Sequence, residues 1–314
     1  MNHSSPPLIV VVGPTASGKS ELALRLAEEL GGEIVNADSV QVYRYFDIGS
    51  AKPSAAELAR VPHHLVDAVE PTAPLDAGQW CALADAAIGD IVARGRTPVV
   101  CGGTFLWVKA LLYGLAPAPP ADATLRERHR QLADAEGRAA LHQRLGAVDP
   151  VAAARLNPND FVRVSRALEV FELTGRPLSE FQAEHGFSAP RYAARLVGVA
   201  RERDTMDQRI HERTRAMFQA GWVDEVRELL RRGFGDTRPM LSVGYRQIAE
   251  ALGAEAPLDL GELELSVYRA TRVFARRQRT WLRDQPVEWL DAGSLDAGSL
   301  DDGRLTPGRL TPRR

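Results

Sequence analysis

Eight residues near the N-terminus have the types and the spacing of a phosphate-binding loop. Residues 13–20 read GPTASGKS and match the pattern G-x-x-x-x-G-K-[ST] at every fixed position. Glycines at both ends permit backbone conformations in which successive N–H groups point at an anion. Lys19 adds a positive charge, and the hydroxyl of Ser20 is a suitable ligand for Mg²⁺. We therefore predict a site for phosphate groups made of Gly13, Pro14, Thr15, Ala16, Ser17, Gly18, Lys19 and Ser20.

Asp38 is the second candidate for chemistry. It follows an apolar stretch at 33–37, and open parallel sheets place ligands beyond the carboxyl ends of their strands. A carboxylate at such a position either accepts a proton as a general base or caps the following turn. Because Asp38 shares the edge of the sheet with the phosphate loop, we predict the general base. Gln41 and Tyr43 follow on the same loop and are candidates for contact with a polar base edge.

Gly102-Gly103-Thr104 ends another apolar stretch, 97–101. An enzyme that hydrolyses ATP usually carries an acidic residue here to position Mg²⁺ and water. The two glycines instead allow a ligand to approach closely, and the Thr104 hydroxyl can donate to a leaving oxygen. This composition favours a protein that binds diphosphate over one that hydrolyses a nucleoside triphosphate.

Residues 269–283 (RATRVFARRQRTWLR) contain six arginines and no acidic residue. On a helix, Phe274 and Trp281 share a face and are predicted to anchor the segment to the core. Steps of three and four residues place five of the arginines along another face of this helix: Arg269, Arg272, Arg276, Arg279 and Arg283. This arginine stripe has no acidic residue to pair with, and such a row of like charges favours a polyphosphate partner.

Two shorter clusters are also candidates for contact with a nucleic acid. Arg163 and Arg166 lie three residues apart and are predicted to be exposed at the start of a helix. Tyr245 and Arg246 place an aromatic ring beside a guanidinium group, a pairing that suits the stacking of a nucleotide.

The elements that must position these residues can be read from the apolar pattern. Residues 8–12 (LIVVV) are typical of a buried parallel strand, and the amphipathic stretch after Ser20 is typical of a helix that ends at Gly31-Gly32. Strands are also predicted at 33–37, 63–69 and 97–101, and helices at 76–94 and 105–112. This alternation predicts an α/β fold with a P-loop NTPase-like parallel sheet flanked by helices.

The alternation stops at Pro117-Ala118-Pro119-Pro120, and only helices are predicted from there to about residue 187. A strand at 195–200 and helices at 204–220 and 222–232 follow. We therefore predict a discontinuous catalytic core, 1–116 plus 191–290, with an inserted all-helical domain at 117–190. Residues 291–314 repeat every five residues, are rich in Gly, and are predicted to be a disordered tail.

The composition excludes several classes of protein. The chain has 314 residues, a net charge of −2 and 45% apolar residues, which is ordinary for a globular protein with a large core. Cys81 and Cys101 are too few for a disulfide framework or a cysteine-based zinc site. No apolar run approaches the roughly 18 residues of a membrane span, and MNHSSPP has no features of a signal peptide. We expect a cytoplasmic protein.

Together these segments resemble the tRNA dimethylallyltransferase family, also called tRNA isopentenyltransferase, in its bacterial form. The resemblance implies transfer of a dimethylallyl group from dimethylallyl diphosphate to N6 of the adenosine just 3′ of the tRNA anticodon, with Mg²⁺, by a monomer. It covers about residues 8–290 and rests on GPTASGKS, DSVQVYRYFDIGSAKP, HHLVDAVEP, GGTFLWVKALLYGL, NDFVRVSRALEVFELTGRP, SVGYRQ and ARRQRTWLR.

The resemblance also implies roles for individual residues. Asp38 would accept the proton of N6, while Lys19, Thr104 and Mg²⁺ would stabilise the charge on the leaving oxygen. Arg213 matches a family arginine that contacts the diphosphate. The residues it implies for binding of the anticodon stem-loop of tRNA are Asp38, Ser39, Val40, Gln41, Thr104, Arg126, Val162, Arg163, Val164, Ser165, Arg166, Gly244, Tyr245, Arg246, Arg272, Arg276 and Arg279.

The chain departs from the family pattern at Val162, where Gln is usual, and at Phe105, Trp107 and Val273. Three other functions stay open at this point. They are a P-loop kinase for small molecules, an isopentenyltransferase for free AMP or ADP, and a non-catalytic RNA-binding module. The resemblance implies that the helical insertion contacts tRNA. The insertion and the arginine stripe count against the kinase and against the enzyme for free AMP or ADP, because neither of these enzymes would need to hold an RNA.

Overall fold

The computed structural model describes residues 8–292. The chain divides into two compact units: unit 1 consists of residues 1–111 and 192–314, and unit 2 of residues 112–191. Nearly all of the tail predicted at 291–314 lies outside the described residues. Among residues 8–292, no helix combines the length and the apolar character needed to cross a membrane.

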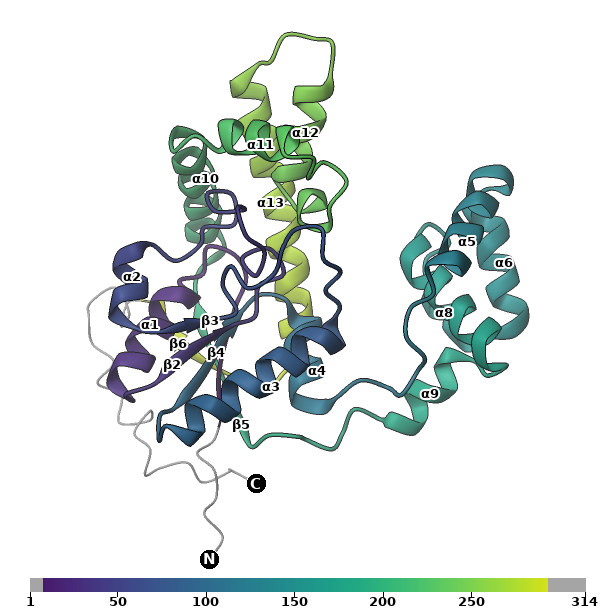
Figure 1. Ribbon diagram of the computed structural model, residues 1–314, viewed down its shortest axis with the longest axis horizontal. Coiled ribbons are helices and arrows are strands. Elements are labelled where there is room, and N and C mark those ends of the chain that lie inside the picture. The colour runs from purple at the N-terminus through teal and green to yellow at the C-terminus, as the bar shows by residue number, and fades with distance from the viewer. Residues whose placement is uncertain (1–7, 293–314) are drawn as a thin grey trace, which may run out of the picture. The chain divides into compact units, whose positions relative to one another are not determined.

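Unit 1 is built on a six-stranded parallel sheet (Figure 1). The strands lie in the order β3-β2-β4-β1-β5-β6, so the predicted parallel α/β fold is confirmed. In the register of the centre, Val10 of β1 pairs with Val100 of β4 and with Leu196 of β5. The bounds are β1 Leu8–Val12, β2 Glu33–Asn36, β3 His63–His64, β4 Pro98–Gly102, β5 Ala194–Ala200 and β6 Val287–Asp291.

Two strands differ from the prediction. β3 stops at His64 and does not reach residue 69, because Leu65 and Asp67 have positive φ angles of 61° and 52°, which an extended strand excludes. β6 was not predicted. Its five residues, VEWLD, alternate in polarity too briefly to separate an edge strand from a loop.

Helices cover both faces of the sheet. α1 (Lys19–Glu29) packs its Leu22 and Leu26 against Ile9, Val11 and Val99, which all lie on one face of the strands. The side chains that alternate with these point to the opposite face. There α3 (Ala77–Ala93) and α4 (Phe105–Tyr113) are joined by stacking of Trp80 on Trp107, with ring centroids 4.9 Å apart.

The remaining helices of unit 1 gather beyond the carboxyl ends of the strands, and the long α13 runs back along the sheet to β6 (Figure 1). These helices therefore contribute side chains to the same edge as the phosphate loop. They are α10 Arg203–Gln219, α11 Trp222–Arg231, α12 Tyr245–Gly253 and α13 Leu260–Leu282, with a 3₁₀ turn at Arg238–Leu241; the short α2, Ala55–Arg60, lies elsewhere in unit 1.

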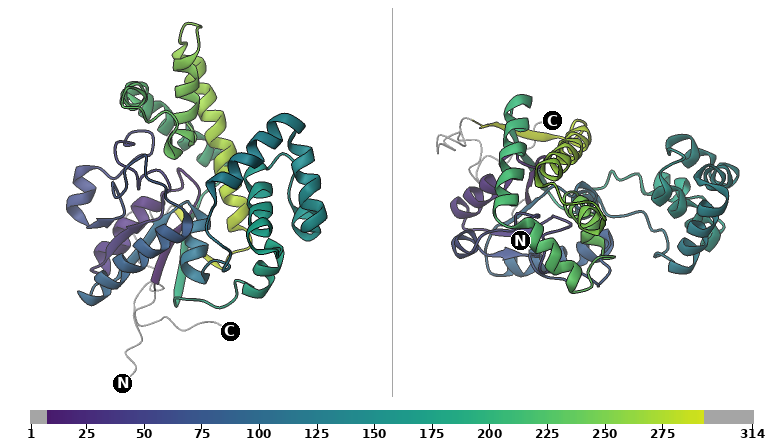
Figure 2. Two further views of the ribbon diagram at one scale, coloured as in Figure 1. Left: turned by 45° about the vertical axis from the view of Figure 1, so that its right-hand side comes forward. Right: turned by 90° about the horizontal axis from the view of Figure 1, so that it is seen from above.

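Unit 2 is helical throughout, as predicted, and two separate segments connect it to unit 1 (Figure 2). Its core includes Leu141, Leu145, Val164 and Leu168. α8 begins at Phe161, because the side chain of Asp160 accepts from the N–H of Arg163 and caps the helix there. The helices are α5 Ala123–Glu136, α6 Arg138–Val148, α7 Pro150–Arg155, α8 Phe161–Thr174 and α9 Leu178–His185.

A fully buried carboxylate, Glu169, joins α8 to α5 in unit 2. Arg126 donates to both of its oxygens at 2.9 and 3.0 Å, Arg166 donates as well, and the N–H of Asp122 donates at 2.6 Å. Burial alone would raise the pKa of Glu169, but these hydrogen bonds outweigh it and lower the pKa below the ordinary value of 4.5.

Glu169→Gln should lower the free energy of unfolding near neutral pH by about 1–3 kcal/mol, because an amide cannot accept at both positions. The folded-state pKa of Glu169 lies below its unfolded value, so its stabilisation is present above the unfolded value and is lost as pH falls through the folded one. Urea unfolding at neutral and acidic pH should therefore show a difference between wild type and variant that shrinks on acidification. Exposed Glu127, changed to Gln, is the matched control on α5; equal effects of the two changes would contradict the assignment.

Candidate functional site

The predicted phosphate loop joins β1 to α1 at the carboxyl edge of the sheet. Gly18 caps α1 in the left-handed conformation, with φ of 99°, which explains the glycine at this position. The first residues of α1 are Lys19 and Ser20, so the positive end of the helix dipole faces the same site.

Two arginines that the sequence analysis missed hold the loop from the side of α10. Arg201 donates from Nε to the carbonyl oxygen of Ser17 at 2.8 Å, and Arg209 donates from Nε to that of Ala16 at 3.0 Å. These bonds fix the backbone of the loop, which must hold its N–H groups in place to bind an anion. No local motif marks either arginine, since their partners lie nearly two hundred residues earlier.

One cavity brings together five of the predicted catalytic and phosphate-binding residues: Thr15, Lys19, Ser20, Asp38 and Arg213. Burial lowers the pKa of Lys19 and of Arg213, whereas the nearby charge of Asp38 raises both. A bound anion would favour the charged forms further, so the cavity is suited to a polyanion. Its lining includes Thr15, Lys19, Ser20, Asp38, Gln41, Gly102, Arg213, Phe274 and Gln278.

Asp38 both caps a turn and lines the cavity. Its Oδ1 accepts from the N–H groups of Val40 at 2.8 Å and of Gln41 at 3.2 Å. Its Oδ2 makes no hydrogen bond with the part of the chain that the structure describes, which leaves that oxygen available to accept a proton. The two interpretations of Asp38 are therefore compatible, one for each carboxylate oxygen.

Thr104 is held directly beside Asp38. Its hydroxyl accepts from the N–H of Ser39 at 2.9 Å, and its own N–H donates to the carbonyl of Ala37 at 3.2 Å. Gly102 allows this approach, since a Cβ there would lie 2.1 Å from the oxygen of Ala37. Because the hydroxyl accepts from Ser39, its proton is free to point at another oxygen.

Gln278 of α13 is a further residue of the site that the sequence analysis did not identify. Its side-chain oxygen accepts from the N–H of Thr15 at 2.8 Å, and its side-chain nitrogen donates to the carbonyl of Gly103 at 3.0 Å. One signal could have found it: Gln278 is a polar residue on the buried face of α13, where Ala275 and Leu282 also lie.

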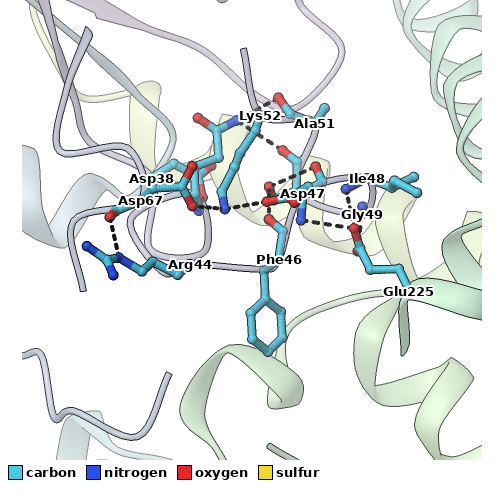
Figure 3. A network of polar contacts seen from close by, with 12 residues as sticks. Asp38, Arg44, Phe46, Asp47, Ile48, Gly49, Ala51, Lys52, Asp67 and Glu225 are labelled. Atoms are coloured by element: carbon cyan, nitrogen blue, oxygen red, sulfur yellow. Dashed lines mark hydrogen bonds and ion pairs between the residues drawn. The ribbon is translucent and has the colours of Figure 1, made fainter. Parts of the chain in front are cut away.

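The loop after Asp38 is held by a network of polar contacts (Figure 3). Gln41 donates to the carbonyls of Ser50 and Ala51 at 3.0 and 2.9 Å, so it supports the loop. Lys52 lies between two carboxylates, with Asp47 at 2.6 Å and Asp67 on its other side. The loop is therefore an ordered wall of the site.

Glu225 of α11 anchors the tip of this loop. Its Oε2 accepts from the N–H groups of Asp47 at 3.0 Å and Ile48 at 2.6 Å, and its Oε1 accepts from that of Gly49 at 3.3 Å (Figure 3). The hydroxyl of Tyr245 donates to the same carboxylate at 2.6 Å. A carboxylate thus takes up three successive backbone donors.

Tyr245 was predicted to stack on a nucleotide, and the structure contradicts this. Its side chain is 1% exposed and packs between Phe46 and Trp222, with centroid distances of 4.9 and 5.4 Å. Gly244 is buried against the same tryptophan. Of the three residues proposed here, only Arg246 is exposed.

In unit 2, Val164 and Ser165 are buried on the inner face of α8 and cannot present a surface to RNA. Arg126 and Arg166 are occupied by Glu169. Val162 and Arg163 are exposed, and of the residues predicted here these two remain available for contact with RNA.

The arginine stripe of α13 is exposed, as predicted, and borders a groove against α10 that also contains Arg203. One member is not unpaired: Arg272 forms an ion pair with Asp207 and lies over the ring of Tyr268. Trp281 anchors the helix by stacking on Phe105, with centroids 4.4 Å apart. Phe274 does not, because it is 40% exposed and lines the cavity of the loop.

The metal prediction concerns Ser20, which is exposed at the start of α1 and lines the cavity. Among residues 8–292 there is no group of three or more His, Cys, Asp or Glu side chains that could hold a metal ion. A Mg²⁺ ion here would therefore take oxygen ligands from Ser20 and from phosphate, the kind of ligand set that this ion commonly has.

Comparison with known proteins agrees with this geometry. The profile of a family described as IPP transferase matches residues 41–285, and that of the isopentenyl transferase family matches residues 6–68. The tRNA dimethylallyltransferase of Sorangium cellulosum is 64% identical over 283 residues, with 90% of each chain covered. That of Geobacter sulfurreducens is 50% identical over 290 residues, with 92% of this chain and 93% of that protein covered.

Solved structures are similar too. The tRNA isopentenylpyrophosphate transferase of Bacillus halodurans is 36% identical and aligns with a TM-score of 0.66, over 91% of this chain and 90% of that chain. A eukaryotic dimethylallyltransferase acting on tRNA is 24% identical and aligns with a TM-score of 0.80, over 96% of this chain and 77% of that chain. The second likeness bears on the fold alone.

Glu225→Gln should loosen the loop at 47–49, because an amide nitrogen cannot accept from the backbone donors that the carboxylate now binds. We expect hydrogen exchange at the amides of Asp47, Ile48 and Gly49 to become about tenfold faster, with a loss of about 1–3 kcal/mol in the free energy of unfolding. Glu228→Gln on the same helix is the control, because that carboxylate pairs with Arg231 and Arg232 and with no residue of the loop. Unchanged exchange at these three amides would show that Glu225 does not hold the loop.

Proposed function

Since the chain belongs to the tRNA dimethylallyltransferase family, we propose that the cavity at the carboxyl edge of the sheet transfers a dimethylallyl group from dimethylallyl diphosphate to N6 of an adenosine beside the tRNA anticodon. The observation that carries this proposal is the meeting of Lys19, Arg213 and Asp38 in one cavity. Two cations suit a diphosphate, and a carboxylate with a free oxygen suits a proton acceptor.

The transfer forms one bond and breaks another. N6 of the adenosine attacks C1 of the dimethylallyl group, the bond from C1 to the bridging oxygen breaks, and the diphosphate leaves with the electron pair. Oδ2 of Asp38 accepts the proton that N6 loses, while Oδ1 keeps the carboxylate in place through its bonds to Val40 and Gln41. A modest base is enough, because departure of the diphosphate drives the step.

The leaving group gains negative charge as the bond breaks, and three side chains oppose it. Lys19 and Arg213 supply positive charge within the cavity, and the Thr104 hydroxyl donates to the bridging oxygen. Mg²⁺, held by Ser20 and the phosphate oxygens, would neutralise part of the same charge. The phosphate loop thus binds a leaving group, which accounts for Gly-Gly-Thr where an ATPase carries an acid.

The reacting adenosine must leave the stack of the anticodon loop to reach Asp38. The surfaces available to hold the RNA are the arginine stripe of α13 and the exposed start of α8 at Val162 and Arg163. An enzyme for free AMP or ADP would need neither surface, so these features favour tRNA as the acceptor.

Asp38→Asn should abolish most of the transfer of the dimethylallyl group while leaving the binding of tRNA intact. Asn keeps an oxygen that can accept from Val40 and Gln41, so the loop stays ordered, but it cannot accept the proton of N6. We expect transfer of label from dimethylallyl diphosphate to unmodified tRNA, with Mg²⁺ and without ATP, to fall by about 10²–10⁴-fold. Asp90→Asn, an exposed change on α3, is the control; wild-type rates for Asp38→Asn would rule out this base, and no labelling by wild-type protein would rule out the function.

Charge reversal at Arg276 and Arg279 should weaken tRNA binding and reduce its dependence on salt, by roughly one to two units of slope in a plot of log affinity against log salt. The affinity for diphosphate should barely change, because neither arginine lines the cavity of the phosphate loop. Filter binding of tRNA across a salt series, with calorimetry of diphosphate, measures both. An equal loss of diphosphate affinity would place the stripe within the active site.

A further inference from the structure

Gln278 connects two parts of the active site that come from distant parts of the chain. Its side chain is 6% exposed, and both ends of its amide are used: the oxygen accepts from Thr15 of the phosphate loop, and the nitrogen donates to Gly103. Gly103 is followed directly by Thr104. One rigid amide therefore spans the backbone of the diphosphate loop and that of the turn that carries the Thr104 hydroxyl.

The surroundings leave this amide little freedom. A Cβ on Gly103 would lie 2.5 Å from Nε2 of Gln278, so the absence of a side chain there lets the amide approach the backbone. Its two partners, the N–H of Thr15 and the carbonyl of Gly103, are backbone groups whose positions are set by the ends of the strands β1 and β4. Because the Gln278 side chain is buried, an amide group that lost one of these hydrogen bonds would be left without a partner, which is costly.

The bond to Thr15 also removes one donor from the loop. An N–H group that a protein acceptor occupies is not available to the diphosphate, so Gln278 does not act by binding the ligand. It acts on the backbone that the ligand meets. This separates its role from that of Lys19 and Arg213, whose charges face the cavity.

We propose that Gln278 is a positioning residue that holds the diphosphate loop and the Thr104 turn at the separation required for transfer. This inference rests on the proposed function. The oxygens of the leaving group meet the loop, and the bridging oxygen meets the Thr104 hydroxyl, so both must be in place together. Misplacement by about 1 Å can reduce a rate about 10²-fold without abolishing binding.

Gln278→Glu tests the proposal through pH. A protonated carboxyl group keeps the pattern of the amide: its carbonyl oxygen accepts from Thr15 and its O–H donates to Gly103. An ionised carboxylate has no donor for the carbonyl of Gly103 and repels it. Burial raises the pKa of such a carboxyl group, so the ratio of variant to wild-type kcat should rise about tenfold or more as pH falls through that pKa.

Two further variants complete the experiment. Gln278→Leu lacks both bonds, and its kcat should fall about 10- to 100-fold at every pH, with a change of less than about threefold in the affinity for diphosphate. Gln208→Glu on α10, where the side chain is exposed, should match wild type throughout. Transfer of label to tRNA, calorimetry of diphosphate and thermal unfolding provide the readouts.

The results separate the two proposals. If wild-type protein transfers label but Gln278→Leu retains its kcat, or if the ratio for Gln278→Glu does not change with pH, Gln278 has no positioning role. If wild-type protein itself transfers nothing, the proposed function fails first. Should Gln278→Leu not fold, the pH dependence of Gln278→Glu still decides, because loss of packing alone would not be restored by a proton.

Discussion

The contact between Gly102 and the carbonyl of Ala37 is the constraint on which the site depends. β4 lies between β2 and β1 in the sheet, so the turn after β4 is the neighbour of both Asp38 and the phosphate loop. A side chain at Gly102 would lie 2.1 Å from the oxygen of Ala37, so the two strand ends can approach closely only with glycine there. The same carbonyl accepts from the N–H of Thr104, which places the Thr104 hydroxyl beside Ser39.

Local patterns were sufficient for the parts of the site that are local in the chain. The phosphate loop, Asp38 and Thr104 each follow a buried strand, and a parallel sheet brings such positions to one edge whatever the rest of the chain does. Gln278 and Glu225 were missed because their partners are remote: 263 residues separate Gln278 from Thr15. Only the packing of α13 and α11 shows what these side chains meet.

Errors in the assignment of helix faces have a similar origin. Tyr245 and Phe274 are both aromatic residues on amphipathic helices, and the sequence predicted the first to be exposed and the second to be buried. The structure reverses both, because Trp222 and Phe46 cover Tyr245, whereas Phe274 faces the cavity of the loop. Periodicity separates the faces of a helix, but the neighbours of the helix decide which aromatic side chain they cover.

The cations of the chain fall into two groups with different physical consequences. Lys19 and Arg213 are partly withdrawn from water, and burial lowers their pKa values. The negative charge of a diphosphate bound between them would favour the protonated forms of both side chains and so oppose the effect of burial. The arginines of α13 are solvated, and their attraction to RNA is screened by salt. Gln278 lies between these groups, on the helix that carries the exposed arginines and against the loop that holds the half-buried Lys19. The surface that would hold the RNA and the amide that holds the diphosphate loop are therefore on one helix, α13.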